Sequence, residues 1–143
     1  MIVFRDATEA ERAGVVRSQW INRVAPRRDG KDEGPHGVTF GRKEAAVSHA
    51  IATRMVELLV DDLTRSAAVT VIVAESDKLP GEVMGWVAFE PGEAVHFVCV
   101  PSGYGRAKLG TNLLRRAGAT LPGSWSTPNG RALTRAIGEE QAA

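Results

Sequence analysis

Apolar residues recur along this chain with two periods, one typical of strands and one typical of helices. Ile2, Phe4 and their neighbours predict a first strand. Thr8 and Glu11 have the spacing of a capping box, which predicts the start of a helix that ends at Pro26. Apolar residues at helical spacing mark the inner side of this helix, namely Val16, Trp20 and Val24.

A second helix is predicted from about residue 42 to residue 64. Its large apolar residues fall on one side and are expected to face the core; they are Val47, Ile51, Met55, Leu58 and Leu59. His49 lies in this helix and is interpreted as structural. The preceding stretch from Arg27 to Gly41 is rich in glycine and charge, and it is too long for an ordinary connection. A binding loop and a disordered loop both remain open there.

Three strands are predicted next, at residues 69–76, 82–90 and 94–100. The links between them are too short for parallel crossovers, so the pairing must be antiparallel. A helix is predicted from Lys108 to Ala117, with Leu109 and Leu113 on its apolar stripe. A short strand near residues 124–127 and a last helix at residues 128–137 would complete the chain. The predicted order is β-α-α-β-β-β-α-β-α, an α+β fold.

Composition narrows the class of protein. The chain has 143 residues, of which 43% are hydrophobic and 24% are charged, so one globular domain over residues 1–143 is expected. No stretch is apolar enough for a membrane span and the N-terminus lacks a signal peptide, which predicts a cytoplasmic protein. The single cysteine, Cys99, excludes an internal disulfide. The three histidines are not spaced as metal ligands, so no metal site is expected; they are His36, His49 and His96.

Charge is distributed unevenly although the net charge is only +1. Residues 1–93 hold twelve basic and fifteen acidic residues, whereas residues 94–138 hold six basic residues and no acidic one. Such a block is often only a solvated face, but a local positive field also concentrates anions. A phosphorylated or otherwise acidic ligand is therefore expected at this block. Its members are Arg106, Lys108, Arg115, Arg116, Arg131 and Arg135.

The stretch FVCVPSGYGRAKLGTNLL, residues 97–114, carries the most specific signal. Pro101 removes a donor from the ladder, and Gly103 and Gly105 allow unusual backbone angles, so the chain can leave its neighbouring strand. A helix then starts near Lys108. Its first amides have no partner within the helix and favour an anion, which Arg106 and Lys108 would reinforce. The pattern predicts a phosphate cradle, with an ordinary strand-to-helix loop as the alternative.

This stretch, VPSGYGRAKLGTNLL, and the order of elements together resemble the GNAT superfamily of N-acyltransferases, in particular small GNAT-like proteins of bacteriophages and prophages. The family motif, [Q/R]-x-x-G-x-[G/A], opens a helix with paired leucines. Gly110 matches its last position, and Leu113 and Leu114 match the leucine pair. Gly105 and Lys108 stand at the other two positions and depart from the motif. The strand VHFVCV and the segment TPNGRALTRAIG are also similar to family elements.

The resemblance implies a mainly antiparallel sheet flanked by helices, and transfer of an acyl group, most simply acetyl from acetyl-CoA, to an amine of a small molecule or protein. It implies a substrate-side loop at residues 26–41. No membrane partner is implied, nucleic acid is disfavoured, and a homodimer is left open. The residues implied in cofactor binding are Val98, Cys99, Val100, Gly105, Arg106, Ala107, Lys108, Leu109, Gly110, Thr111 and Asn129.

Catalytic side chains are less well defined. Many members of the family use a tyrosine of the last helix as an acid, but the single tyrosine here, Tyr104, precedes the motif. His96 and Glu93 are the candidates for a general base, with Glu90 also nearby. A buried structural histidine is the alternative for His96. Core packing is expected for Cys99 and for the three tryptophans, Trp20, Trp86 and Trp125, although Trp125 could also edge a substrate cleft.

Three functions remain open from the sequence. The first is an acyl-CoA-dependent N-acyltransferase. The second is a catalytically degenerate GNAT-fold binding or regulatory protein, which Lys108 and the absence of the tyrosine favour. The third is a small nucleic-acid-binding protein, which the low net charge and the lack of interleaved aromatic residues disfavour.

Overall fold

The computed structural model describes residues 1–24, 49–101, 108–118 and 139. The chain divides into two compact units, which are described separately: Met1–Glu9 with Ala67–Ala143, and Ala10–Ser66. Several sequence predictions concern residues outside the described ranges. They are the loop at 26–41, the short strand near 124–127, the last helix at 128–137, and the side chains of His36, His49, Tyr104 and Trp125.

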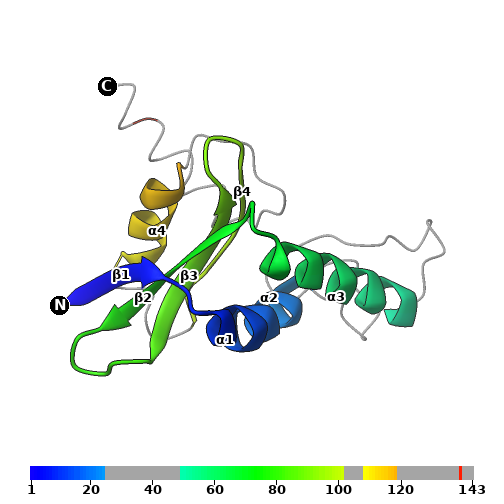
Figure 1. Cartoon of the computed structure of the whole chain (residues 1–143), viewed down its shortest axis with the longest axis horizontal. Helices are drawn as coiled ribbons and strands as arrows, with labels where there is room; N and C mark the ends of the chain where they lie inside the picture. The colour runs from blue at the N-terminus through cyan, green and yellow to red at the C-terminus, as the bar shows by residue number, and fades with distance from the viewer. Residues whose placement is uncertain (25–48, 102–107, 119–138, 140–143) are drawn as a thin grey trace. The chain divides into compact units, whose positions relative to one another are not determined.

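The first unit contains a four-stranded antiparallel sheet in the order β1-β2-β3-β4 (Figure 1). Its strands are β1 (Ile2–Asp6), β2 (Thr70–Ser76), β3 (Val83–Glu90) and β4 (Ala94–Cys99). The predicted strands and their antiparallel pairing are confirmed. The α+β class is confirmed as well, and the described elements follow the predicted order up to the helix after β4.

Helix α4 (Leu109–Ala117) packs on one face of this sheet. Its buried residues meet alternate residues of the strands, as expected for side chains on one face of a pleated sheet; the α4 residues are Leu109, Leu113, Leu114 and Ala117, and the strand residues include Ala74, Val87, Phe89 and Val95. The guanidinium of Arg116 also lies over the ring of Phe4, 4.1 Å from its centroid. The predicted apolar stripe of this helix is therefore confirmed.

The strand residues that alternate with the residues facing α4 lie on the other face of the sheet, and they are buried too. Trp86 and Phe97 contact each other there, with ring centroids 5.9 Å apart. Cys99 lies on the same face and is 1% exposed, so its predicted role in core packing is confirmed.

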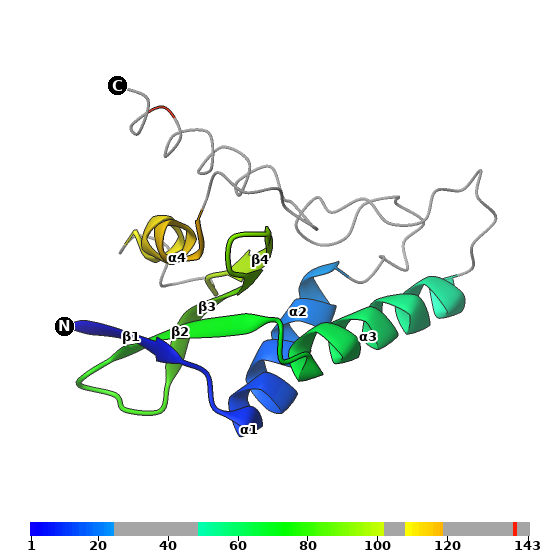
Figure 2. The same cartoon turned by 45° about the horizontal axis from the view of Figure 1, so that its top comes forward.

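The second unit is helical (Figure 2). A continuous helical run comprises α1 (Glu9–Glu11), the π-helical segment η1 (Arg12–Val16) and α2 (Arg17–Val24), and it begins directly after Thr8 as predicted. Its predicted inner side is confirmed, because Val16, Trp20 and Val24 are buried. Helix α3 (His49–Arg65) contacts this run.

The predicted inner side of α3 is wrong. Ile51, Met55, Leu58 and Leu59 are exposed, whereas smaller residues are buried, namely Ala52, Val56 and Val60. Val47 lies outside the described residues. The physical reason is that α3 is apolar on two sides, and periodicity alone cannot tell which side a neighbouring helix covers. The side with the smaller residues allows a close approach between helices.

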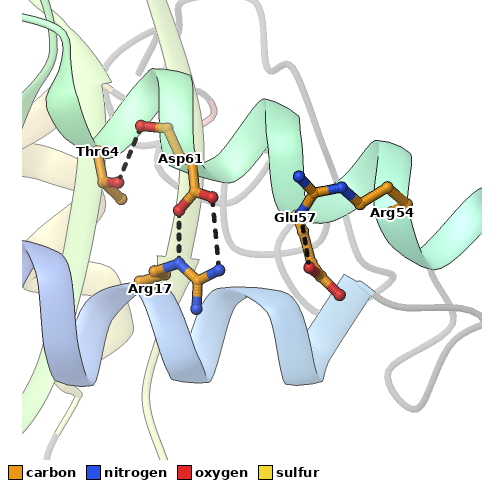
Figure 3. Close-up of polar contacts among 5 residues, drawn as sticks. All are labelled: Arg17, Arg54, Glu57, Asp61 and Thr64. Atoms are coloured by element: carbon orange, nitrogen blue, oxygen red, sulfur yellow. Dashed lines mark hydrogen bonds and ion pairs between the residues drawn. The ribbon is translucent and has the colours of Figure 1, made fainter.

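Arginines of the first helical run hold the C-terminal half of α3. Arg12 donates hydrogen bonds to the carbonyl oxygens of Thr64 (2.8 Å) and Ser66 (3.0 Å). Arg17 binds the Asp61 carboxylate through both Nε (2.5 Å) and Nη2 (3.4 Å), as Figure 3 shows. The hydrogen bond from Arg17 lowers the pKa of Asp61. The positive charges of Arg17 and of other arginines lower it further, whereas desolvation by burial raises it.

The lowered pKa of Asp61 predicts a pH-dependent contribution to folding. The ionised pair stabilises the folded state above the unfolded pKa of about 3.9, and this stabilisation is lost as the pH falls through the lower folded value. Both side chains are partly exposed, so we expect Asp61→Asn to cost only about 1 kcal/mol at pH 7. Thermal unfolding at pH 7 and pH 3 measures this difference. An equal deficit of the variant at both pH values would contradict the prediction.

Candidate functional site

The candidate site begins where β4 ends. The last paired residues are Trp86 and Cys99, and beyond them Val100 and Pro101 have left the ladder with β3. The strand ends before Pro101 as predicted, and the next strand, from which the chain is expected to diverge, lies outside the described residues. β4 is the last strand of the described part of the sheet, and α4 packs against β3 and β4.

Gly85 allows α4 and the end of β4 to approach β3 closely. A Cβ at this position would lie 3.1 Å from the carbonyl oxygen of Cys99 and 3.3 Å from side-chain atoms of Leu113 and Val100. Real Cβ contacts are seldom this short, so a side chain here would displace its neighbours. Sequence reasoning missed Gly85, although a glycine inside an apolar strand is a known signal for close approach.

Lys108 precedes α4 in a left-handed conformation, with φ 56° and ψ 27°. It is the only non-glycine residue with positive φ among the described residues. A left-handed lysine costs about 1–2 kcal/mol relative to the right-handed conformation. Lys108, which departs from the family motif, thus has a backbone conformation that glycine adopts without this cost.

The first three amides of α4 are called the open amides below, because no described residue accepts a hydrogen bond from them. The first backbone bond of the helix runs from the Asn112 amide to the Lys108 carbonyl oxygen (3.1 Å). No described acceptor binds the amides of Leu109, Gly110 and Thr111, and Lys108 forms no side-chain cap. Three adjacent N–H groups at the positive end of a helix favour an anion.

Basic residues of α4 lie at both of its ends. Lys108 is at the amino end, whereas Arg115 and Arg116 are in the last turn, about 10 Å further along the axis. Arg116 packs over Phe4. Among the described basic residues of the block, Lys108 therefore lies closest along the chain to the open amides. Arg106, Arg131 and Arg135 fall outside the described residues.

His96 lies at an irregularity of β4. Ala88 pairs with Phe97 and Phe89 pairs with Val95, so the register skips His96. This β-bulge interrupts the simple alternation of side chains. His96 is 7% exposed, and its Nε2 lies 3.2 Å from Oε1 of Glu90. The structure therefore brings His96 together with Glu90.

Glu93 lies in the turn before β4, where its amide donates to the Glu90 carbonyl oxygen (3.0 Å) and its side chain is exposed. No described contact joins the Glu93 side chain to His96. His96 is about 10 Å along β4 from Cys99, and Glu93 is further away than His96. Glu93 and His96 therefore lie toward the start of β4, whereas Cys99 is at its end.

The remaining predicted cofactor residues are only partly described. Val98 and Val100 are half-buried beside the α4 cluster, and Leu109 is fully buried, so only its backbone can face a ligand. Gly105, Arg106, Ala107 and Asn129 lie outside the described residues. In the described part of the chain, no cluster of three or more histidine, cysteine, aspartate or glutamate residues could hold a metal ion. No helix in that part has the length and apolar character for crossing a membrane.

Solved structures of GNAT-family acetyltransferases are similar to this chain. A protein from Desulfovibrio desulfuricans, described as an acetyltransferase of that family, is 15% identical, with a TM-score of 0.47 over 81% of this chain and 63% of its own. An acetyltransferase from Streptococcus pneumoniae is 18% identical, with a TM-score of 0.41 over 82% and 64%.

A spermidine/spermine N-acetyltransferase from Vibrio cholerae is 11% identical, with a TM-score of 0.42 over 81% of this chain and 59% of its own. This chain therefore spans about three fifths of the length of these proteins. No family model and no curated protein matches it. The proposal below rests on the residues of this chain.

The close approach at Gly85 predicts unequal effects of two glycine substitutions. Gly85→Ala should destabilise the protein by about 1–3 kcal/mol, because the new Cβ would push on Cys99 and Leu113. Gly14→Ala is the matched control, because a Cβ there meets nothing within 4 Å. It should stabilise the helical run by about 0.5–1 kcal/mol. Chemical denaturation measures both, and a Gly85→Ala variant as stable as the wild type would contradict the close approach.

Proposed function

We propose that this chain is an acyl-CoA-dependent N-acyltransferase that moves an acyl group, most simply acetyl, from CoA to an amine. The observation that carries this proposal is the start of α4 after the end of β4, where the amides of Leu109, Gly110 and Thr111 have no acceptor among the described residues. The motif resemblance across residues 97–114 supports it. The proposal also retains the predicted cytoplasmic location and an amine acceptor of unspecified identity.

The described residues fit the charged part of CoA. Its pyrophosphate would accept hydrogen bonds from the three open amides, and the ammonium of Lys108 would add a positive charge. The backbone of Val98, Cys99 and Val100 would bind the pantetheine arm, because amide groups of that arm can pair with a strand. Gly105, Arg106, Ala107 and Asn129 complete the proposed site.

The proposed reaction is direct attack of a neutral amine on the thioester carbonyl. A C–N bond forms, the C–S bond breaks, CoA leaves as a thiolate, and the amine loses a proton. His96 would accept that proton through water, with Glu90 holding the imidazole by the 3.2 Å contact. Glu93, at the start of β4, is the second carboxylate proposed for this proton transfer. The thiolate is a tolerable leaving group without a tyrosine acid.

A second candidate is a binding protein of the same fold that performs no transfer. The burial of His96 favours it, because a buried histidine paired with Glu90 also serves a purely structural role. The side chain of Lys108 at a position that is glycine in the motif favours it as well.

Calorimetry and a turnover assay separate these candidates. The full-length chain is titrated with acetyl-CoA, CoA and a short DNA duplex, and thiol release is followed over a panel of primary amines. The transferase predicts binding of both CoA compounds and amine-dependent thiol release. Binding of CoA without release over the panel favours the binding protein, and salt-sensitive binding of the duplex alone overturns the proposal.

Substitutions of Lys108 test the phosphate cradle. Lys108→Glu should weaken CoA binding at least tenfold, because it places a negative charge beside the pyrophosphate. Lys108→Gly should weaken binding less than Lys108→Glu, because it removes the ammonium without adding a negative charge, and it should gain about 1 kcal/mol of stability, because glycine adopts the left-handed conformation freely. Lys78→Glu is the control, since Lys78 is an exposed lysine in the turn after β2. Equal weakening by Lys108→Glu and Lys78→Glu would remove the cradle assignment.

Substitutions around His96 separate a catalytic role from a structural one. If His96 acts as the base, His96→Gln should lower kcat by about 10²–10⁴-fold with little change in the Kd for CoA. Glu90→Gln should lower kcat more than Glu93→Gln, because Glu90 contacts the imidazole. A fall in Tm with unchanged kcat would instead assign His96 to the core.

A further inference from the structure

Gly85 lies against both described parts of the proposed CoA site. A Cβ at this position would lie 3.1 Å from the Cys99 carbonyl oxygen, and 3.3 Å from Cγ2 of Val100 and from Cδ1 of Leu113. Cys99 and Val100 end the segment proposed for the pantetheine arm, whereas Leu113 belongs to the helix that begins with the open amides. One residue of β3 therefore adjoins the supports of both halves of the cofactor.

The space around Gly85, and not its backbone conformation, makes glycine suitable at this position. Among the described residues the glycines with positive φ are Gly81, Gly92 and Gly118, and Gly85 is not one of them. The backbone here thus suits a residue with a side chain, and a glycine inside a strand otherwise weakens it. What a side chain would disturb is therefore the arrangement of the neighbours of Gly85.

Two small residues lie side by side below α4. Gly85 pairs with Ala74 of β2, and Ala74 is fully buried in the cluster that includes Leu109 and Leu113 of α4. Small residues at such a pair allow a closer approach between helix and sheet than larger ones would. The distance between α4 and the sheet therefore depends on the sizes of these two residues.

We propose that Gly85 is a positioning residue that sets the distance between the end of β4 and α4, so that one CoA molecule contacts both. This inference rests on the proposed function. CoA joins its pyrophosphate covalently to its pantetheine arm, so the second contact gains from the first only when the two supports are correctly spaced. A Cβ at residue 85 would displace its neighbours by a few tenths of an ångström. Such a displacement weakens binding of the joined ligand more than binding of one half.

Titrations of the full-length chain with CoA and with 3′-phospho-ADP test the proposal. The second compound is the half of CoA that carries the pyrophosphate without the pantetheine arm. The wild type should bind CoA at least about tenfold more tightly than 3′-phospho-ADP, and Gly85→Ala should lower this ratio about five- to tenfold. Gly14→Ala, where a Cβ meets nothing within 4 Å, should leave the ratio unchanged. Equal weakening of both ligands by Gly85→Ala would overturn the proposal.

The double variant Gly85→Ala/Leu113→Val separates positioning from packing, and it supplies a folded protein if Gly85→Ala alone does not fold. The second substitution removes one carbon where the first adds one, so the Tm should return toward the wild-type value. The Cys99 carbonyl belongs to the backbone and cannot be shortened, so the end of β4 stays displaced and the ratio should remain low. A ratio that returns together with the Tm assigns Gly85 to packing alone and overturns the proposal.

Failure of this inference and failure of the proposed function give different results. A wild type that binds neither CoA nor 3′-phospho-ADP overturns the proposed function, and this inference with it. A wild type that binds CoA no more tightly than 3′-phospho-ADP overturns the positioning role, because the arm then contributes nothing. A wild type with the expected ratio, which Gly85→Ala leaves unchanged, overturns the positioning role alone.

Discussion

The close packing of α4 against β3 at Gly85 is the constraint on which the candidate site depends. Without a Cβ at this position, Leu113, Val100 and the carbonyl of Cys99 share a space that one methyl group would fill. The α4 helix is therefore anchored beside the end of β4 by its buried leucines. The amides of Leu109, Gly110 and Thr111, which have no acceptor among the described residues, belong to this anchored helix, and rigid placement is what makes a set of backbone donors useful for binding an anion.

Lys108 shows how the chain enters that helix. The left-handed conformation has a cost for a lysine, and Lys108 directly precedes the first turn of α4, whose leading amides have no acceptor within the helix. The backbone and the side chain of Lys108 would act differently on a bound pyrophosphate. The left-handed conformation suits the glycine position of the motif. The Cβ narrows the space in which a pyrophosphate would approach the backbone, while the ammonium would attract it.

Periodicity predicted the sheet and α4 because each has one dominant apolar side, so Leu109, Leu113 and Ala117 could be assigned from spacing alone. It failed on α3, where two apolar sides compete and the larger residues are outside. The bulge at His96 was also beyond sequence reasoning, because an extra residue in a strand depends on the pairing with β3. Gly85 was readable in principle, but its meaning depends on Leu113, far away in the sequence.

The distribution of residue sizes on α3 has a physical consequence for the helical unit. Burying Ala52, Val56 and Val60 removes less apolar area from water than burying isoleucine, methionine and leucine would. The helix pair is held in addition by the hydrogen bonds of Arg12 and by the Arg17–Asp61 pair.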